Sequence, residues 1–144
     1  MKKIFILFLA AAGLCSSITF LPFTQAAEDI RDAHVFVYYF HGAARCLTCH
    51  KLEKYSRESI EANFKDRLAS GSLEFKVVNI EDKGNEHYAK DYQLYSQSLI
   101  LSLVKGGEQI KWRNLDKIWE YAGNKKAFIN YVKNGLADFL TEAK

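Results

Sequence analysis

Residues 34–50 read HVFVYYFHGAARCLTCH and contain the most informative pattern of the chain. Its first part, His34–Phe40, consists mainly of β-branched and aromatic residues, is too short for a helix and is apolar on both faces, which predicts a buried strand. Residues 41–44 are mostly small and form a loop, and the cysteines Cys46 and Cys49 follow it. The stretch therefore predicts a strand, a short loop and a helix that starts at a dithiol.

Strand and helix patterns alternate along the rest of the chain. Apolar residues recur at helical spacing from Cys49 to Leu68, with Ser56 as a candidate break. The later elements are expected as a strand at Leu73–Ile80, a short helix at Asn85–Tyr92, a hairpin of Ser98–Val104 and Gln109–Trp112, a helical turn at Asp116–Tyr121 and a final helix from Asn124 to Leu140. A strand, helix, strand order implies a parallel crossover, and the glycine pair in the hairpin implies an antiparallel return. We expect an α/β domain with a central mixed sheet of about four strands flanked by helices.

The dithiol has the spacing of a redox site. A cysteine just before a helix meets free backbone N–H groups and the positive end of the helix dipole, and both favour the thiolate. This placement predicts Cys46 as the attacking sulfur and Cys49, one turn further in, as the resolving thiol. A disulfide across so short a loop removes little unfolded-state entropy, so the pair is expected to serve chemistry and not stability.

Basic neighbours add to this expectation. Arg45 precedes the nucleophile and His50 follows it at helical spacing, so each would stabilise a thiolate at Cys46. His41 lies in the loop at the carboxyl end of the strand, where sites of α/β proteins form. Each also has a plain structural interpretation: a solvated loop charge, an outward helix residue, and a histidine that only hydrogen-bonds the loop backbone.

The N-terminal residues predict export. The chain begins with two basic residues, Lys2 and Lys3, followed by an apolar run shorter than the roughly 20 residues of a membrane span. Small residues end this segment at Ala26. Together these features predict a signal peptide at 1–26. A lipoprotein signal with Cys15 as the lipidation site is the alternative. The remaining 27–144 would form one domain, periplasmic or secreted, without a stable membrane anchor.

Charge restricts the partners. The formal net charge of +3 becomes +1 once the two lysines of the signal are removed. A surface with so small a surplus argues against nucleic acid or an anionic membrane as the main partner, because both need clustered basic residues. A single protein redox partner is expected instead.

The motif Cys46-Leu47-Thr48-Cys49-His50 has two other interpretations. It matches the attachment pattern of c-type haem, although no methionine remains after residue 26 to serve as a second axial ligand. A zinc site from Cys46, Cys49, His50 and His41 has suitable ligand types, although four ligands from one tight turn rarely form a tetrahedron. We expect neither a cofactor nor a bound metal.

From about His34 to Leu140 the sequence resembles the thioredoxin-like superfamily. The segments at residues 40–51, 76–79 and 91–95 further resemble the exported nitrophenyl-compound nitroreductase subunits of ArsF type. That narrower resemblance implies electron delivery to a system that reduces nitroaromatic compounds, alongside a membrane thiol carrier as a redox partner. The wider one implies a thioredoxin-like fold and thiol-disulfide exchange through Cys46 and Cys49.

Three departures from that superfamily bear on the chemistry. Leu47 and Thr48 replace Gly-Pro between the cysteines, and Arg45 stands where tryptophan is common. The acid that thioredoxins place on the strand before the motif has no counterpart, so proton removal from Cys49 is assigned to water or a histidine. Ser98 takes the position of the cis-proline that faces the dithiol, or Leu99 does if the register slips by one.

The sequence therefore predicts an extracytoplasmic thiol-disulfide oxidoreductase or electron-relay subunit. The alternative is a thioredoxin-fold binding or scaffold subunit whose cysteine motif is redox-silent or occupied by metal or haem. Trp112 and Trp119 are candidates for a docking face, although core packing is the commoner fate of tryptophan.

Overall fold

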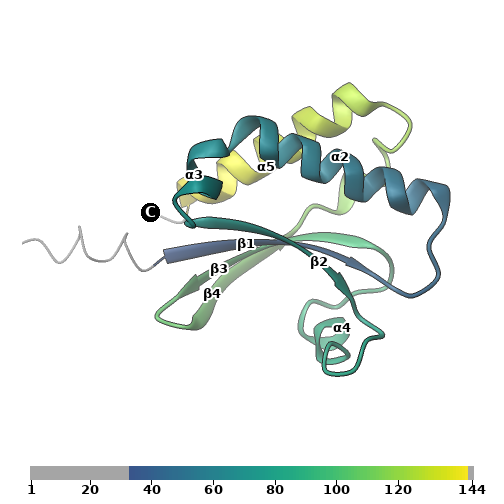
Figure 1. The fold of residues 1–144 in the computed structure, drawn as a ribbon, viewed down its shortest axis with the longest axis horizontal. Coiled ribbons are helices and arrows are strands. Elements are labelled where there is room, and N and C mark those ends of the chain that lie inside the picture. The colour runs from purple at the N-terminus through teal and green to yellow at the C-terminus, as the bar shows by residue number, and fades with distance from the viewer. Residues whose placement is uncertain (1–32, 143–144) are drawn as a thin grey trace, which may run out of the picture.

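The computed structural model describes residues 33–142, which build a four-stranded mixed sheet with helices on both faces (Figure 1). The elements in chain order are β1 (Ala33–His41), α2 (Leu47–Asn63), α3 (Lys65–Ala69), β2 (Leu73–Asn79), α4 (His87–Asp91), β3 (Ser98–Lys105), β4 (Glu108–Asn114), the 3-10 turn η1 (Asp116–Ile118) and α5 (Lys125–Glu142). Each element expected from the sequence is present, with ends that differ by a few residues. The predicted signal peptide lies outside the described residues.

The sheet has the order β2-β1-β3-β4, with β1 at an inner position. The pairing of β1 with β2 is parallel, and it is reached through the crossover helices α2 and α3. β3 is antiparallel to both β1 and β4. The β3–β4 turn uses Gly106 and Gly107 at φ values of 59° and 85°, a region that favours glycine because it has no Cβ. The predicted crossover and hairpin are thus confirmed.

Alternation along β1 divides the core into two layers. Val35, Val37 and Tyr39 face α2 and α5, where they belong to the larger hydrophobic cluster. Tyr38 and Phe40 face the other way, into a smaller aromatic cluster that packs under α4. Figure 1 shows α2 and α5 side by side over one face and the short α4 below the other. The strand is buried on both faces, as its apolar sequence predicts.

Ser56 does not break the first helix, contrary to the sequence expectation. Its buried hydroxyl donates to the carbonyl oxygen of Leu52 at 2.7 Å, a bond that lets serine remain inside a helix. The helix ends instead at Phe64, where φ is −130°, and α3 begins one residue later. α2 is therefore one rigid element from the dithiol to Asn63.

In the described part of the chain no helix is both long and apolar enough to cross a bilayer.

Candidate active site at the start of α2

Cys46 is the N-cap residue of α2, with an extended backbone at φ −87° and ψ 168°. Its sulfur accepts a hydrogen bond from the Cys49 backbone N–H at 3.2 Å, and the Cys46 N–H donates to the Cys49 sulfur at 3.1 Å. N-caps are usually Ser, Thr, Asp or Asn, whose oxygen accepts this same backbone N–H. A sulfur in that place meets a donor and the positive helix end, both of which stabilise a thiolate.

The two cysteines form a disulfide, with their Cα atoms 5.1 Å apart. They differ in exposure: Cys46 is exposed, whereas Cys49 is 3% exposed. Leu47, between them, is 84% exposed. An incoming sulfur can therefore reach Cys46 more readily than Cys49.

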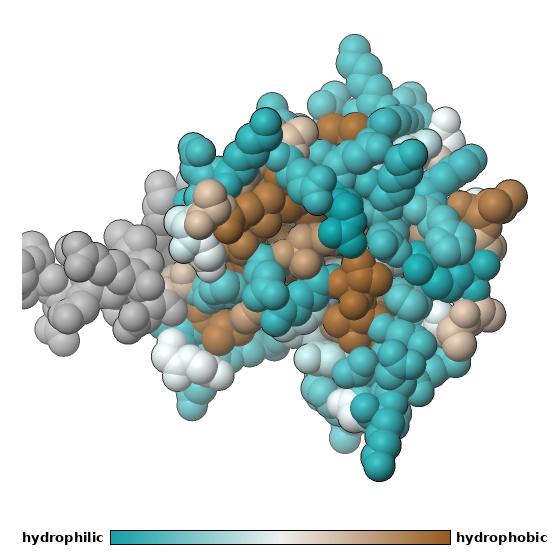
Figure 2. Space-filling view, viewed as in Figure 1, coloured by the Kyte–Doolittle hydropathy of each residue, from teal (hydrophilic) through white to brown (hydrophobic). Residues whose placement is uncertain are grey.

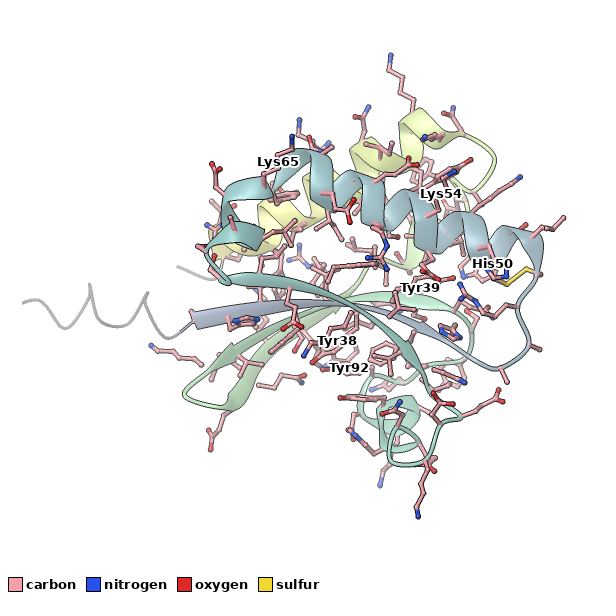
Figure 3. The ribbon with its side chains drawn as sticks, viewed as in Figure 1. Tyr38, Tyr39, His50, Lys54, Lys65 and Tyr92 are labelled. Atoms are coloured by element: carbon pink, nitrogen blue, oxygen red, sulfur yellow. A yellow bond between two sulfur atoms is a disulfide. The ribbon has the colours of Figure 1, made fainter. Side chains whose placement is uncertain are left out.

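The buried side of Cys49 rests on the central strand. The Tyr39 hydroxyl donates to the carbonyl oxygen of Cys49 at 2.7 Å, and both groups are buried. Burial raises the pKa of Tyr39 to about 12, although the nearby Arg45 charge acts in the opposite direction. Tyr39 is therefore a neutral donor at physiological pH, and it fixes the first turn of α2 to β1 (Figure 3).

Arg45 turns inward from the loop. Its guanidinium forms an ion pair with Glu53 and lies 5.9 Å from the centroid of the Tyr39 ring. The side chains of Arg45 and Glu53 are only 19% and 22% exposed. Glu53 also lies 3.7 Å from Arg57. The positive charge of Arg45, which the sequence analysis expected to stabilise a Cys46 thiolate, is thus also paired with the carboxylate of Glu53.

Glu53 is the functional candidate that the sequence analysis missed. It lies four residues after Cys49, on the same side of α2, and its carboxylate reaches back to Arg45, the residue before Cys46. The i, i+4 spacing was the available signal. The first turns after the dithiol therefore carry an acid on the helix, paired with Arg45, whereas the preceding strand carries none.

The two predicted histidines lie at the same end of the molecule. His50 is exposed, and Figure 3 shows it beside the disulfide. His41 ends β1 and its Nδ1 lies 2.8 Å from the Gly42 carbonyl oxygen, which is the plain backbone contact considered above. Its ring centroid is 6.3 Å from that of Tyr39.

Ser98 begins β3 and pairs with Phe40, so it lies at the sheet end from which the loop to the dithiol departs. It is 6% exposed, and its hydroxyl donates to the Ser96 carbonyl oxygen at 2.9 Å. None of the peptide bonds described is cis.

The two tryptophans lie in different environments. Trp119 is 38% exposed and its Nε1 donates to the Gln97 carbonyl oxygen at 2.9 Å, just before β3. Trp112 is partly buried and packs edge-on against Tyr92, with centroids 5.4 Å apart. Trp119 thus borders the site end of the sheet, whereas Trp112 joins the aromatic cluster.

Within residues 33–142 no group of three or more His, Cys, Asp or Glu side chains is arranged to hold a metal ion. In the alternative zinc set of Cys46, Cys49, His50 and His41, the two sulfurs are joined to each other in this structure.

The sheet has the order β2-β1-β3-β4, and a cysteine pair lies at the start of α2, the helix that follows the inner strand β1. These features define a thioredoxin-like α/β fold with a Cys-x-x-Cys site. The solved structures that are similar to the chain include two thioredoxins. A thioredoxin of Fasciola hepatica is 17% identical, with a TM-score of 0.43, over 77% of this chain and 82% of that one. Thioredoxin O2 from Arabidopsis thaliana in its oxidised state is 15% identical, with a TM-score of 0.39, over 72% and 85%. No family model and no curated protein matches the chain.

Proposed function

We propose that the chain is a thiol-disulfide oxidoreductase or electron-relay subunit that works through Cys46 and Cys49. The observation that carries the proposal is an exposed sulfur at the N-cap of α2, bonded to the helix N–H groups, with a buried second sulfur one turn behind it. This arrangement supplies a nucleophile, a resolving thiol and a way to stabilise the thiolate.

The exchange has two steps in the reducing direction. The Cys46 thiolate attacks one sulfur of a substrate disulfide, and the new bond forms as the substrate bond breaks and the leaving sulfur takes a proton. Cys49 then loses its proton and attacks the Cys46 sulfur, which releases the second substrate thiol. The substrate disulfide gains two electrons, and the dithiol is oxidised to the Cys46–Cys49 disulfide.

A redox titration with thiol trapping tests the proposal. In a Cys15→Ser background, which leaves only the two site cysteines, Cys46 and Cys49 should convert together between dithiol and disulfide. Cys46→Ser should abolish exchange with a model disulfide. A pair that never interconverts, or exchange that survives Cys46→Ser, rejects the proposal.

The physiological setting is part of the same proposal. The N-terminal sequence supports work outside the cytoplasm, periplasmic or secreted, with a protein or a membrane thiol carrier as redox partner. The resemblance to nitroreductase subunits of ArsF type supports a role in supplying electrons for nitroaromatic reduction. Trapping tests both: Cys49→Ser should hold Cys46 to its partner as a mixed disulfide that mass spectrometry identifies.

The alternative is a binding or scaffold subunit with an occupied or inert cysteine motif. A Soret absorption band in the purified protein would identify haem, and stoichiometric zinc would identify a metal site. Either result, or thiols that do not exchange, favours the alternative.

A further inference from the structure

The outward side of the first two turns of α2 carries a basic strip, formed by His50, Lys51 and Lys54. All three side chains are exposed, and within residues 33–142 none of them forms an ion pair. Figure 3 shows His50 beside the disulfide and Lys54 about one turn further along α2. The strip therefore begins next to Cys46 and runs along the helix away from it.

The acids nearest to the strip are engaged elsewhere. Glu53, the one acid of the first two turns, is paired inward with Arg45. Glu58 lies four residues after Lys54, where it could compensate that charge, but it accepts Lys125 of α5 at 2.7 Å instead. The positive charge of the strip is thus not neutralised within the described fold.

This charge does not serve the stability of the helix. The first turn of α2 contains no acid, although acids are favoured there because the N-terminal end of the helix dipole is positive. Lys51 near that end adds charge of the unfavourable sign. Its effect, together with Lys54, is to raise the positive potential at Cys46, which both stabilises a thiolate and attracts anionic groups.

An acid also lies beside the loop before Cys46. The Glu81 carboxylate is close to Gly42, with one oxygen 2.5 Å from the place that a Cβ would take. A side chain on Gly42 would therefore displace this carboxylate.

We infer that the basic strip docks an acidic segment that flanks the reactive disulfide of a partner protein and places that disulfide over Cys46. The inference rests on the proposed function and adds the class of partner. Leu47, 84% exposed between the cysteines, supplies an apolar contact next to the reacting sulfur, and Figure 2 shows a hydrophobic group projecting among hydrophilic ones where α2 begins. The basic surface has three residues within positions 50–54, which fits a short peptide segment.

Three peptide disulfides of equal length test the inference. Each has two identical strands joined by one disulfide, with four Glu, four Gln or four Lys around the cysteine. The reduced protein converts each peptide disulfide to two thiols and becomes the Cys46–Cys49 disulfide, and acid quenching with chromatography gives the rate. At low ionic strength the Glu peptide should react about tenfold faster than the Gln peptide. At about 1 M salt, where the Debye length is near 3 Å, the difference should fall below about twofold.

Charge reversal of the strip should invert this preference. In Lys51→Glu/Lys54→Glu the Lys peptide should become the fastest of the three. The matched control is Lys65→Glu/Lys133→Glu, which changes the net charge equally on exposed residues of α3 and α5. Figure 3 places Lys65 at the opposite end of α2 from His50. The control should keep the preference for the Glu peptide.

The outcomes separate the two proposals. Equal rates for the three peptides, or a Glu preference that survives charge reversal, overturn the docking inference while exchange itself stands. No reaction with any peptide, the neutral one included, overturns the proposed function and the inference with it. The variants are compared by the ratio of the rates of two peptides. A change in the reactivity of Cys46 alters both rates equally, so it cancels in this ratio.

Discussion

The Tyr39 hydroxyl donates to the carbonyl oxygen of Cys49 across 2.7 Å, and this buried bond joins the central strand to the first turn of α2. The cysteine that must resolve the mixed disulfide is thereby fixed to an inner strand of the sheet. Cys46, three residues earlier, is held by the hydrogen bonds of the helix cap and by its disulfide to Cys49. The site thus combines a rigid inner sulfur with an accessible outer one.

Tyr39→Phe should lower the free energy of unfolding by about 1 kcal/mol, because it removes one buried hydrogen bond and little volume. Urea denaturation of the oxidised protein measures the change. Tyr38→Phe is the matched control: it lies next to Tyr39 on β1 but faces the aromatic cluster, and no hydrogen bond of its hydroxyl occurs within residues 33–142. Equal losses in the two variants would contradict the proposed anchor.

Cys46 should be more acidic than a free cysteine, whose pKa is about 8.5. The cap hydrogen bond and the helix dipole both favour its thiolate. The pH dependence of alkylation in reduced Cys49→Ser gives the midpoint, and it should fall at least about one unit below the free value. The buried Cys49 of reduced Cys46→Ser should alkylate more slowly at every pH. A midpoint of Cys46 at the free value would remove the basis of the proposed function.

Glu53→Gln should destabilise the protein by about 1–2 kcal/mol, because it leaves the mostly buried Arg45 guanidinium without its carboxylate. Glu61→Gln is the control on the same helix. Glu61 is 59% exposed and lies 3.9 Å from Arg57, so its loss should cost less than about 0.5 kcal/mol. Thermal or urea unfolding of both variants decides whether the inward pair stabilises the loop before the dithiol.

Glu142 should titrate well below the other glutamates. Hydrogen bonds from Lys111 and Arg113 of β4 lower the pKa of its carboxyl to about 2 from the ordinary 4.5. Because the pKa is lowered in the folded protein, the contact contributes fully to the free energy of unfolding above about pH 4.5. This contribution is lost as the pH falls through about 2. A carboxyl-resolved NMR titration measures it. Because the groups are exposed, about 1 M salt should move the midpoint of the Glu142 titration towards 4.5. A midpoint near 4.5 already at low salt would show that these ion pairs do not connect α5 to β4.

Local sequence was sufficient for much of this molecule. The run His34–Phe40 specifies a strand because β-branched and aromatic side chains fit a pleated surface buried on both faces. The loop and the cysteine spacing place Cys46 at the helix start, since capping depends on residues within one turn. These patterns gave the order of the elements and the two sulfurs.

Ser56 shows where local reasoning failed. Serine is a poor helix former on average, which suggested a break, but a buried serine can satisfy its hydroxyl within the helix. The packing of α2 against α5 and the sheet keeps the helix continuous through Ser56. Such packing depends on residues far apart in the sequence.

The chain's own sequence thus determined the thioredoxin-like order of strands and helices and the dithiol at the first strand-to-helix junction, because both depend on contacts between near neighbours. Only the tertiary structure decided that Tyr39 holds Cys49, that Arg45 turns inward to Glu53, and that Lys51 and Lys54 are left uncompensated. Those outcomes depend on which side chains the sheet and α5 bring within a few ångströms of α2, and distances between elements are set by packing of the whole core.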